Sequence, residues 1–469
     1  MSKITPLSKS LIQICGIDAT KFLNGLVTTR LLPNVIKKKE HTFSEQKHAE
    51  LTSMIDIHKN WGLMHEDIFD PQEKILVSRD GDNSMFLNSK GRVVTDCFLY
   101  SIPFHNINHE NKEVLEDEPR YLVEVDTSVS SQLLMMLKLH KLSSDVSISM
   151  KNTLYSYYYY NDSPEFDEWL ESCQDQYFVT PSPLDALDKA NSFVRNETIF
   201  NKKAAESILG FAIDNRIPNF GIKFISTQPL HDDPNRSPSK NLLSLSDLFS
   251  DLFRDRFSIE FCEEEEIKRR RYANGLFEVS DAMKGTSLLP FECNLDYTNG
   301  LCLDKGCYVG QELTIRTYNN GTIRKRIVPV QFFSLKEGSV ELIGDQDFIE
   351  ISLDDPVIMD LQQLSPSIIS KMDVFPLNNN ENEKNSTEDT IPSFASSPFG
   401  ASSRPVRKRN TSSGKLLSIE NNTGFMLISL LTIKKNDLFK VEIPSLEGGG
   451  SKTLGCKVFI PDWWPEEFD

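Results

Sequence analysis

The chain has 469 residues, 39% hydrophobic and 25% charged, and its 51 lysines and arginines against 68 aspartates and glutamates give a net charge of −17. This length accommodates about three domains, and the composition is that of a globular protein with a buried core. An acidic surface repels nucleic-acid phosphates and anionic membranes over most of its area, leaving only a local basic groove for such contacts. The sequence contains no run of about 18 apolar residues, so we predict no transmembrane helix.

The eight cysteines predict a reducing compartment. They include no Cys-x-x-Cys pair and are too sparse for a disulfide scaffold in a chain of this length. The cytosol, the nucleus and the mitochondrial matrix all fit this pattern. Cys293, Cys302 and Cys307 have irregular spacing for zinc and no neighbouring histidines, so we predict no structural metal site.

The N-terminal segment permits two interpretations. Residues 1–17 contain Lys3, Lys9 and several hydroxyl side chains, but no acid and no arginine. This composition fits a short mitochondrial presequence. It also fits an ordinary N-terminus that leads into a strand.

The following elements are a strand and a helix. Residues 10–15 predict the strand, and residues 19–26 predict a helix that begins after a turn at Gly16 and Asp18. Residues 34–74 are rich in lysine, histidine and acids, which predicts a surface insertion.

A β-hairpin is predicted next. Residues 85–88 and 92–100 are apolar runs separated by Ser-Lys-Gly, and Gly91 fits the tight turn between two strands. A further strand is predicted over 121–126. Leucines at helical spacing predict a helix over 130–142.

Of the remaining segments, some are predicted to be ordered and others disordered. Residues 226–246 are rich in Pro, Ser and Asp and resemble an inserted linker. Residues 263–271 form a charge run that predicts a solvated helix face with i,i+4 ion pairs. Residues 362–415 have too few large apolar side chains to offset the entropy of ordering, which predicts disorder. Residues 416–461 alternate in apolar character, as in the strands of a small β-barrel.

The most informative stretch is residues 305–312, Lys-Gly-Cys-Tyr-Val-Gly-Gln-Glu. If residues 309–318 form a helix, Cys307 lies just before its N-terminus, where the helix dipole and the Lys305 ammonium both favour a thiolate. Two glycines, Gly306 and Gly310, flank this cysteine and allow a ligand to approach the backbone closely.

Alternatives remain open in this region. Asn320-Gly321 is a turn signal, so residues 313–328 also fit a hairpin. Cys307 also fits an inert, buried cysteine in a turn. Arg324 and Arg326 would share one face of a strand, where they fit a phosphate or carboxylate site; we expect simple solvent exposure instead.

Residues 305–312 resemble the signature K-G-C-Y-x-G-Q-E of YgfZ-type proteins, which are folate-binding relatives of the glycine-cleavage T-protein, an aminomethyltransferase. The resemblance covers most of the chain outside residues 34–74, 226–246 and 362–415. The further segments that match the family are Phe22–Thr28, Phe86–Asp96, Asp214–Gly221, Gly275–Glu278, Leu289–Asp296 and Trp463–Pro465.

The resemblance implies an α+β fold with three lobes arranged as a ring around a folate-sized central cavity. Residues 1–325 would form a T-protein-like folate-binding region of two interleaved α+β lobes, with insertions at 34–74 and 226–246. Residues 326–469 would form a C-terminal β-barrel lobe that carries the disordered insertion 362–415.

The resemblance also implies a function. The mitochondrial members of the family help to assemble [4Fe–4S] clusters for enzymes such as aconitase and lipoate synthase, beside A-type iron–sulfur carrier proteins. It implies a protein of the mitochondrial matrix with a transit peptide. The apolar pattern and the net charge predict neither membrane insertion nor a nucleic-acid partner. Tetrahydrofolate and a transient iron–sulfur cluster are the candidate cofactors.

The same resemblance assigns roles to residues. Cys307, Lys305 and Asp96 are the candidate catalytic residues, and Cys307 is also the candidate transient ligand of a cluster. The candidate cofactor-binding residues are Asn88, Arg92, Arg216, Glu278, Glu292, Tyr308, Gly310, Gln311 and Glu312.

One position departs from the T-protein pattern and leaves the activity open. T-proteins carry an acidic pair where this chain has Thr95-Asp96, so the carboxylate that orients the reacting amine is missing and we expect aminomethyl transfer to be lost. Asp96 also fits a turn residue of the hairpin, and Glu278 and Glu292 also fit carboxylates that cap backbone. Folate-dependent one-carbon transfer and a helper role in tRNA modification are the alternative functions; the net charge disfavours the second.

Overall fold

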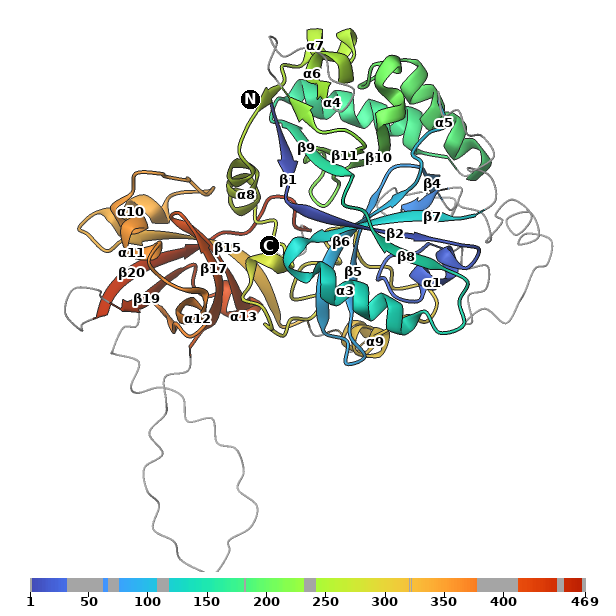
Figure 1. Ribbon diagram of the computed structural model, residues 1–469. Helices are drawn as coiled ribbons and strands as arrows, with labels where there is room; N and C mark the ends of the chain where they lie inside the picture. Colours follow the sequence, from blue (N-terminus) through green and yellow to red (C-terminus); the bar gives the residue numbers. More distant parts are fainter. Residues whose placement is uncertain are drawn as a thin grey trace, which may run out of the picture. The chain divides into compact units, whose positions relative to one another are not determined.

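The computed structural model describes residues 2–31, 62–65, 76–107, 118–180, 183–231, 242–319, 321, 323–377, 412–444 and 451–465. They form two compact units. One unit holds the residues up to 323 together with those from 461 onward, and the other holds residues 324–460. Both units mix helices and strands (Figure 1), so the predicted α+β class is confirmed. The predicted ring of three lobes stays a prediction.

The first unit contains a five-stranded sheet that includes the N-terminal strand. Its strands, in spatial order, are β10 (Ile208–Ile213), β11 (Ile222–Ser226), β9 (Tyr155–Asn161), β1 (Ser2–Leu7) and β14 (Glu260–Phe261). β1 runs antiparallel to β9 and parallel to β14, and its Ile4 is fully buried. The helices that pack against this sheet through a large aromatic core are α4 (Pro164–Cys173), the π-helix η2 (Gln174–Phe178), α5 (Pro183–Arg195), the 3-10 helix η3 (Lys202–Ser207), α6 (Leu245–Leu248) and α7 (Asp251–Arg256).

A second five-stranded sheet completes the first unit. Its strands, in spatial order, are β5 (Asp82–Leu87), β6 (Val93–Ser101), β7 (Arg120–Asp126), β2 (Lys9–Cys15) and β8 (Ser147–Met150). Helices α1 (Ala19–Asn24) and α3 (Thr127–His140) pack against it, burying Leu23, Leu133 and Leu137. The hairpin, strands and helices predicted from residue 10 to residue 142 are confirmed, with ends shifted by a few residues.

The two sheets face each other across a small core. Its apolar members come from both sheets and are Leu11, Phe98, Tyr100, Ile102, Leu122, Ala212 and Ile225. A buried ion pair also crosses it, because Lys223 Nζ on β11 lies 3.0 Å from Glu124 Oε1 on β7. Only Ser8 separates β1 from β2. The first fifteen residues therefore supply one strand to each sheet, and the strand interpretation of the N-terminal segment is confirmed.

The connections of the first unit add short elements. These are the antiparallel pair β3 (Leu63–His65) and β4 (Leu76–Ser78), the parallel pair β12 (Leu230–His231) and β13 (Leu243–Ser244), helix α8 (Glu264–Ala273), the 3-10 turn η4 (Val279–Asp281) and helix α9 (Gln311–Asn319). Of the predicted insertions, residues 34–61, 66–74 and 232–241 lie outside the described residues. The helix predicted over 309–318 is confirmed as α9.

The structure of the charge run 263–271 differs from the one predicted. It forms α8 as expected, but Arg271 is only 6% exposed and its Nη1 lies 2.8 Å from Asp281 Oδ2. Arg270 lies 2.7 Å from Asp162, and no ion pair within α8 appears among its described residues. The prediction of a solvated helix face was wrong for Arg271, because sequence spacing does not reveal partners contributed by other segments.

The second unit is a curled six-stranded antiparallel sheet. Its strands, in spatial order, are β16 (Val374–Pro376), β19 (Leu438–Pro444), β20 (Ser451–Val458), β15 (Lys325–Ser334), β18 (Thr423–Ser429) and β17 (Gly414–Glu420). A bridge between Asp373 and Lys415 connects its two outer strands, and the predicted barrel-like lobe is confirmed. Its helices are α10 (Ser339–Gly344), α11 (Pro356–Leu361), α12 (Pro366–Ile369) and α13 (Leu430–Ile433).

Two further predictions for the second unit need correction. Residues 362–377 were predicted to be disordered, but they contain α12 and β16, and β16 is stabilised by pairing with β19. Residues 378–411 lie outside the described residues. Arg326 was expected to be exposed, yet it is 2% exposed, whereas Arg324 is exposed.

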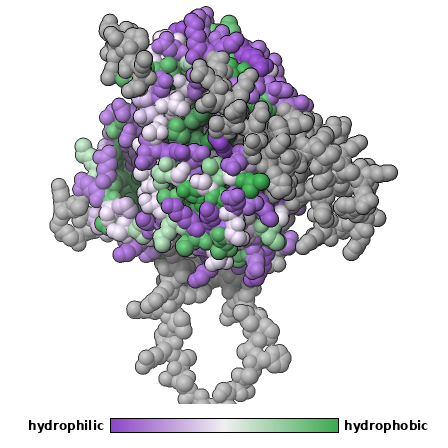
Figure 2. Space-filling view, turned by 45° about the vertical axis from the view of Figure 1, so that its right-hand side comes forward, coloured by the Kyte–Doolittle hydropathy of each residue, from purple (hydrophilic) through white to green (hydrophobic). Residues whose placement is uncertain are grey.

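Figure 2 shows one face of the molecule, where hydrophilic residues dominate and apolar residues gather in smaller areas. Within the part of the chain that the structure describes, the helices are all too short or too polar to cross a membrane.

Candidate functional site

Residues 305–312 are anchored on the loop that follows α1. The Lys305 ammonium is buried and donates hydrogen bonds to the carbonyls of Val27, at 2.6 Å, and Thr29, at 2.5 Å. Val309 N donates to the Gly25 carbonyl at 3.0 Å. These bonds join residues about 280 positions apart in the sequence. Lys305 therefore fixes the loop backbone, and its predicted effect on the thiol stays a prediction.

Two glycines fit this segment against the β5–β6 hairpin. Gly310 has φ +82°, and a Cβ there would lie 2.5 Å from the Asn88 carbonyl oxygen. Gly91 has φ +71°, and a Cβ there would lie 2.9 Å from the Gly310 carbonyl oxygen. Both the left-handed backbone and the close approach require glycine. The predicted hairpin and the signature segment 305–312 thus pack directly against each other.

The cysteine at the centre of the signature is exposed, and α9 begins four residues after it. This position excludes the inert, buried cysteine that the sequence left open. The next residue, Tyr308, is buried, and burial raises the pKa of its phenol to about 12. Its ring lies 4.9 Å from Lys305 Nζ. Cys307 is thus a surface thiol on a backbone that is fixed on both sides.

The polar residues that follow act mainly on the local backbone. Gln311 Oε1 accepts a hydrogen bond from Tyr308 N at 3.0 Å, which closes the turn before α9. Glu312 is exposed in the first turn of α9, where a carboxylate interacts favourably with the helix dipole.

Asn88, Arg92 and Glu292 also occupy backbone-supporting positions. Asn88 Oδ1 accepts from Lys90 N at 2.9 Å and from Arg92 N at 3.1 Å, which holds the hairpin turn. Glu292 Oε2 accepts from Leu289 N at 2.8 Å. The alternative reading of Glu292 as a carboxylate that caps backbone is therefore the one that the geometry supports.

A second group of predicted residues forms a buried ionic cluster. Arg216 Nε and Nη2 each lie 2.8 Å from the Asp214 carboxylate, and Nη1 lies 2.9 Å from Glu278 Oε1. Lys9 Nζ lies 3.0 Å from Glu278 Oε2, and Arg271 Nε lies 3.6 Å from Glu278 Oε1. Three cations thus surround one carboxylate, which is the arrangement that a buried charge requires.

This surrounding determines the protonation of the acids. Burial opposes ionisation of Glu278, but Arg271, Lys9 and Arg216 outweigh it and hold the pKa of that carboxyl well below its usual range. Burial also opposes ionisation of Asp214, and Arg216 lowers its pKa nonetheless. Both groups are therefore anions at neutral pH.

Asp96 differs from these two acids. Burial and the neighbouring Glu278 charge raise the pKa of Asp96, although Lys9 and Arg216 act in the opposite direction. Its Oδ1 accepts from Val279 N at 3.3 Å. Asp96 is thus a poorly compensated carboxylate at the edge of the cluster.

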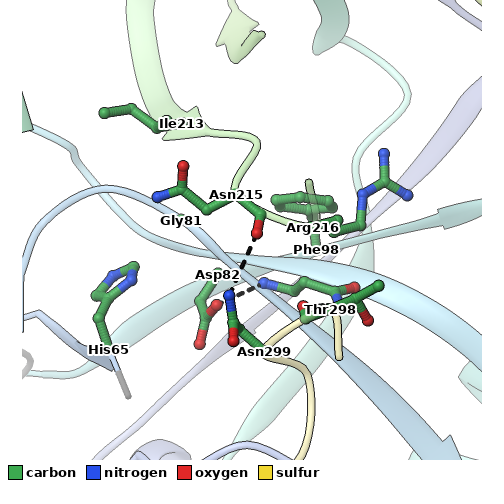
Figure 3. A pocket seen from close by; sticks show the side chains of 10 residues that line it. His65, Gly81, Asp82, Phe98, Ile213, Asn215, Arg216, Thr298 and Asn299 are labelled. Carbon is green, nitrogen blue, oxygen red and sulfur yellow. Dashed lines mark hydrogen bonds between the residues drawn. The ribbon is translucent and has the colours of Figure 1, made fainter. Parts of the chain in front are cut away.

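A small polar cavity lies beside Arg216, and its free space of about 10 Å³ is about that of one water molecule. Its lining residues are His65, Gly81, Asp82, Asn83, Phe98, Ile213, Asn215, Arg216, Thr298 and Asn299. Figure 3 shows His65 on one side and Arg216 with Phe98 on the other, with hydrogen bonds from Asn83 to the Thr298 carbonyl and from Asn299 to the Asn215 carbonyl. Of the predicted site residues, Arg216 is the one in this lining.

The predicted residues therefore fall into two groups: those of the signature and hairpin, and the ionic cluster with its cavity. Sequence reasoning missed Lys9, Arg271 and Asp281, because nothing in their spacing links them to Glu278. It also missed Asp214, although the matching segment Asp214–Gly221 contained it. Buried Cys302, whose sulfur lies 3.3 Å from Arg30 Nη2, gave no signal either.

Metal ligands are not concentrated at either group. Within the described ranges, no three or more His, Cys, Asp and Glu side chains are placed to hold a metal ion together.

Comparison with known proteins identifies the family. A curated protein of Debaryomyces hansenii, "Iron-sulfur cluster assembly factor IBA57 homolog, mitochondrial", is 55% identical over 468 residues, covering 99% of each chain. The protein of the same name from Candida albicans is 54% identical over 464 residues, covering 98% of each chain. "Iron-sulfur cluster assembly factor IBA57, mitochondrial" of Saccharomyces cerevisiae is 29% identical over 385 residues, covering 77% of this chain and 73% of its own.

This chain belongs to the family of mitochondrial iron–sulfur cluster assembly factors IBA57, and the predicted recognition is confirmed. No protein-family model matches the chain. Among solved structures, the glycine cleavage system aminomethyltransferase T of Bartonella henselae is 9% identical with a TM-score of 0.46, covering 99% of this chain and 86% of that one.

Proposed function

We propose that this protein is an assembly factor of the mitochondrial matrix that promotes the maturation of [4Fe–4S] proteins. The observation that carries the proposal is the exposed thiol of Cys307 on a backbone fixed by Lys305, Gly310 and Gln311. The relatives at 55% and 54% identity, which are named as iron–sulfur cluster assembly factors of mitochondria, support the same process and compartment.

A thiolate is a soft ligand that binds iron in iron–sulfur clusters. Iron–sulfur clusters are generally held by four such ligands, whereas the described residues offer one exposed cysteine in this segment and no grouped metal ligands around it. Cys307 would therefore contribute one ligand to a cluster whose remaining ligands come from another protein. The rigid backbone would present the sulfur to that partner without a cost of ordering the loop.

A-type iron–sulfur carrier proteins are the partners that we propose, with aconitase-type and lipoate-synthase-type enzymes as the clients. A carrier would hold the cluster together with Cys307 and then release it to the client. The exchange requires no redox step by this protein, because thiolate ligands of the client replace the thiolates of Cys307 and of the carrier at the irons of the cluster.

The experiment is anaerobic mixing of the purified protein with an A-type carrier that holds a reconstituted cluster. We expect a complex whose visible absorption and electron paramagnetic resonance spectra differ from those of the carrier alone. Cys307→Ser should abolish the spectral change, whereas the control Cys15→Ser, a partly exposed cysteine on β2, should retain it. An unchanged spectral response in Cys307→Ser would overturn the assigned ligand role.

We also propose tetrahydrofolate as a cofactor or regulator that binds at the cavity beside Arg216. Asp82, Asn83, Asn215 and Asn299 carry donors and acceptors that fit a flat polar heterocycle, and the Phe98 ring lines the same space. The free space between these side chains is about 10 Å³, far below the about 300–1,000 Å³ typical of ligand sites, so the side chains that line it would have to move apart to admit the ring end of a folate. Bound folate would supply one-carbon chemistry; the side chains that line the cavity would bind and orient its ring.

Calorimetric titration with tetrahydrofolate tests this assignment. We expect Asn215→Ala to weaken binding by about tenfold, because one hydrogen-bonding group is lost at the ring. The control Asn274→Ala, exposed at the end of α8, should bind as the unchanged protein does. Equal affinities for both variants would contradict the cavity as the folate site.

A further inference from the structure

One face of the first unit is apolar and basic, in contrast to the acidic chain as a whole. Helix α3 exposes Met135 and Leu139, each at 66%, and Leu142, just beyond its end, is 88% exposed. These residues follow one another at i, i+4 and i+7, which places them along one stripe of a helix. Their neighbours Leu133 and Leu137 are fully buried, so the helix is anchored by its opposite face.

A second segment is bonded to the turn that follows α3. The turn at Gly16–Asp18 is held to the turn after α3, because Asp18 N donates to the Asp145 carbonyl at 3.3 Å and Asp145 N donates to Asp18 Oδ2 at 2.8 Å. Ile17 in this turn is 47% exposed. We call the surface of Ile17, Met135, Leu139 and Leu142 the α3 patch.

Leu142 is unfavourable for the isolated fold in two ways. Its φ is +44°, in the left-handed region that is costly for a residue with a Cβ and is usually filled by glycine at a helix end. Its side chain also gains nothing from burial. Leu142 therefore stabilises neither the backbone nor the core. Its exposed side chain is available for contact with another molecule.

The charge of the patch indicates its partner. Residues 127–142 carry Lys138, His140 and Lys141 and no acid, in a chain with 68 acids and a net charge of −17. Lys138, His140 and Lys141 are all exposed. Asp145 is exposed in the following turn, so the basic character belongs to the helix.

We propose that the α3 patch is a docking surface for a partner protein that presents apolar side chains ringed by carboxylates. A lipid surface fits less well, because membrane-binding segments carry about four to eight clustered cations and the rest of this chain repels anionic lipid. A second copy fits less well, because a twofold axis through the patch would bring like charges together.

The patch also belongs to the layer that holds the signature segment. Val309 packs against the same core as Leu133 and Leu137, under helices α1 and α3. A partner on α3 would therefore contact the layer that supports Cys307. The proposal goes beyond the ligand role of Cys307, since docking does not require the thiol.

The experiment begins with the photo-crosslinking residue benzoylphenylalanine at position 135 of the full chain, illuminated in isolated mitochondria. The same residue at position 252, a leucine that is 69% exposed on α7, is the control. Mass spectrometry should identify a protein adduct that position 135 gives and position 252 does not. Phosphatidylcholine vesicles with and without cardiolipin, and sedimentation of the purified chain, test the lipid and self-association alternatives.

Affinity of the purified, identified partner then tests the stripe and its charge. Leu139→Ser and the double variant Lys138→Glu with Lys141→Glu should each weaken binding by about tenfold or more, whereas Leu252→Ser should not. Leu142→Gly should weaken binding while leaving the melting temperature unchanged or higher, an outcome that a purely structural leucine would not give. Cys307→Ser should bind normally, which separates this proposal from the ligand role.

Absence of a position-specific protein adduct, a lipid or self adduct, or equal affinity of Leu139→Ser and Leu252→Ser for the partner would overturn the proposal.

Discussion

Arg216 Nη1 lies 2.9 Å from Glu278 Oε1, so one guanidinium joins a loop after β10 to the residue just before η4, 62 positions later. The other two nitrogens of the same guanidinium donate to Asp214, so Arg216 binds two carboxylates at once. Lys9 extends the contact to the first residue of β2. The pair therefore connects segments that the sequence keeps far apart.

Removing this guanidinium should destabilise the protein strongly. Arg216→Met leaves Asp214 and Glu278 buried without their shared partner, and breaking a buried ion pair costs about 3–5 kcal/mol of the free energy of unfolding. The matched control is Arg256→Met, because Arg256 pairs with Glu165 at 2.8 Å on the surface, where such pairs contribute about 0–1 kcal/mol. Urea denaturation measures both. Equal losses would contradict the buried network.

The same cluster predicts an acid-dependent loss of stability. The folded-state pKa of Glu278 is lowered, so its contribution is complete above the unfolded pKa of about 4.3 and is lost as the pH falls through the folded value. In the unchanged protein the free energy of unfolding should decline below about pH 4.3. In Glu278→Gln the decline should be shallower, starting from a less stable protein. Denaturant curves at a series of pH values check the slopes, and parallel slopes would be inconsistent with the assigned ionisation.

Asp96→Asn should not destabilise the protein, in contrast to Glu278→Gln. Burial and the Glu278 charge raise the pKa of Asp96, so its ionised form is disfavoured in the fold and the stability that it provides falls as pH rises through that raised value. A neutral amide of the same shape should raise the melting temperature at pH 7 or leave it unchanged. A loss of client maturation despite this stability would give Asp96 a functional role; a lowered melting temperature would contradict the electrostatic account.

The signature segment offers a matched pair of glycines. Gly310→Ala should destabilise the protein by about 1–3 kcal/mol, because its Cβ would meet the Asn88 carbonyl oxygen at 2.5 Å from a left-handed backbone. Gly306→Ala should be nearly neutral, since a Cβ there would meet nothing within 4 Å. Thermal unfolding of the two variants makes the comparison. Equal melting temperatures would mean that the segment does not rest on the hairpin as described.

The N-terminal strand should be needed for folding. Ile4 is fully buried in the first core, so Ile4→Ala should lower the free energy of unfolding by about 2–5 kcal/mol. Ile17→Ala, at 47% exposure, should change it by less than about 0.5 kcal/mol. Chemical denaturation decides between them, and a stable Ile4→Ala variant would show that β1 is dispensable.

Local patterns predicted the hairpin at 85–100 and the helix over 130–142, because turn glycines and helical spacing are sequence features that span only a few residues. They also placed Cys307 before a helix. They failed at Arg271 and Arg326, since the burial of a charge depends on distant partners. They failed again at residues 362–377, where the three-residue strand β16 is stabilised by β19 rather than by its own composition.

The most direct test of the account is the activity of a [4Fe–4S] enzyme, such as aconitase, per amount of its protein in mitochondria that carry Cys307→Ser as the sole version of this chain. The account predicts that this activity falls to the level found without the chain, while the variant remains folded and abundant and Cys15→Ser supports normal activity. Normal aconitase activity with Cys307→Ser would contradict the central claim that the exposed thiol works in cluster maturation.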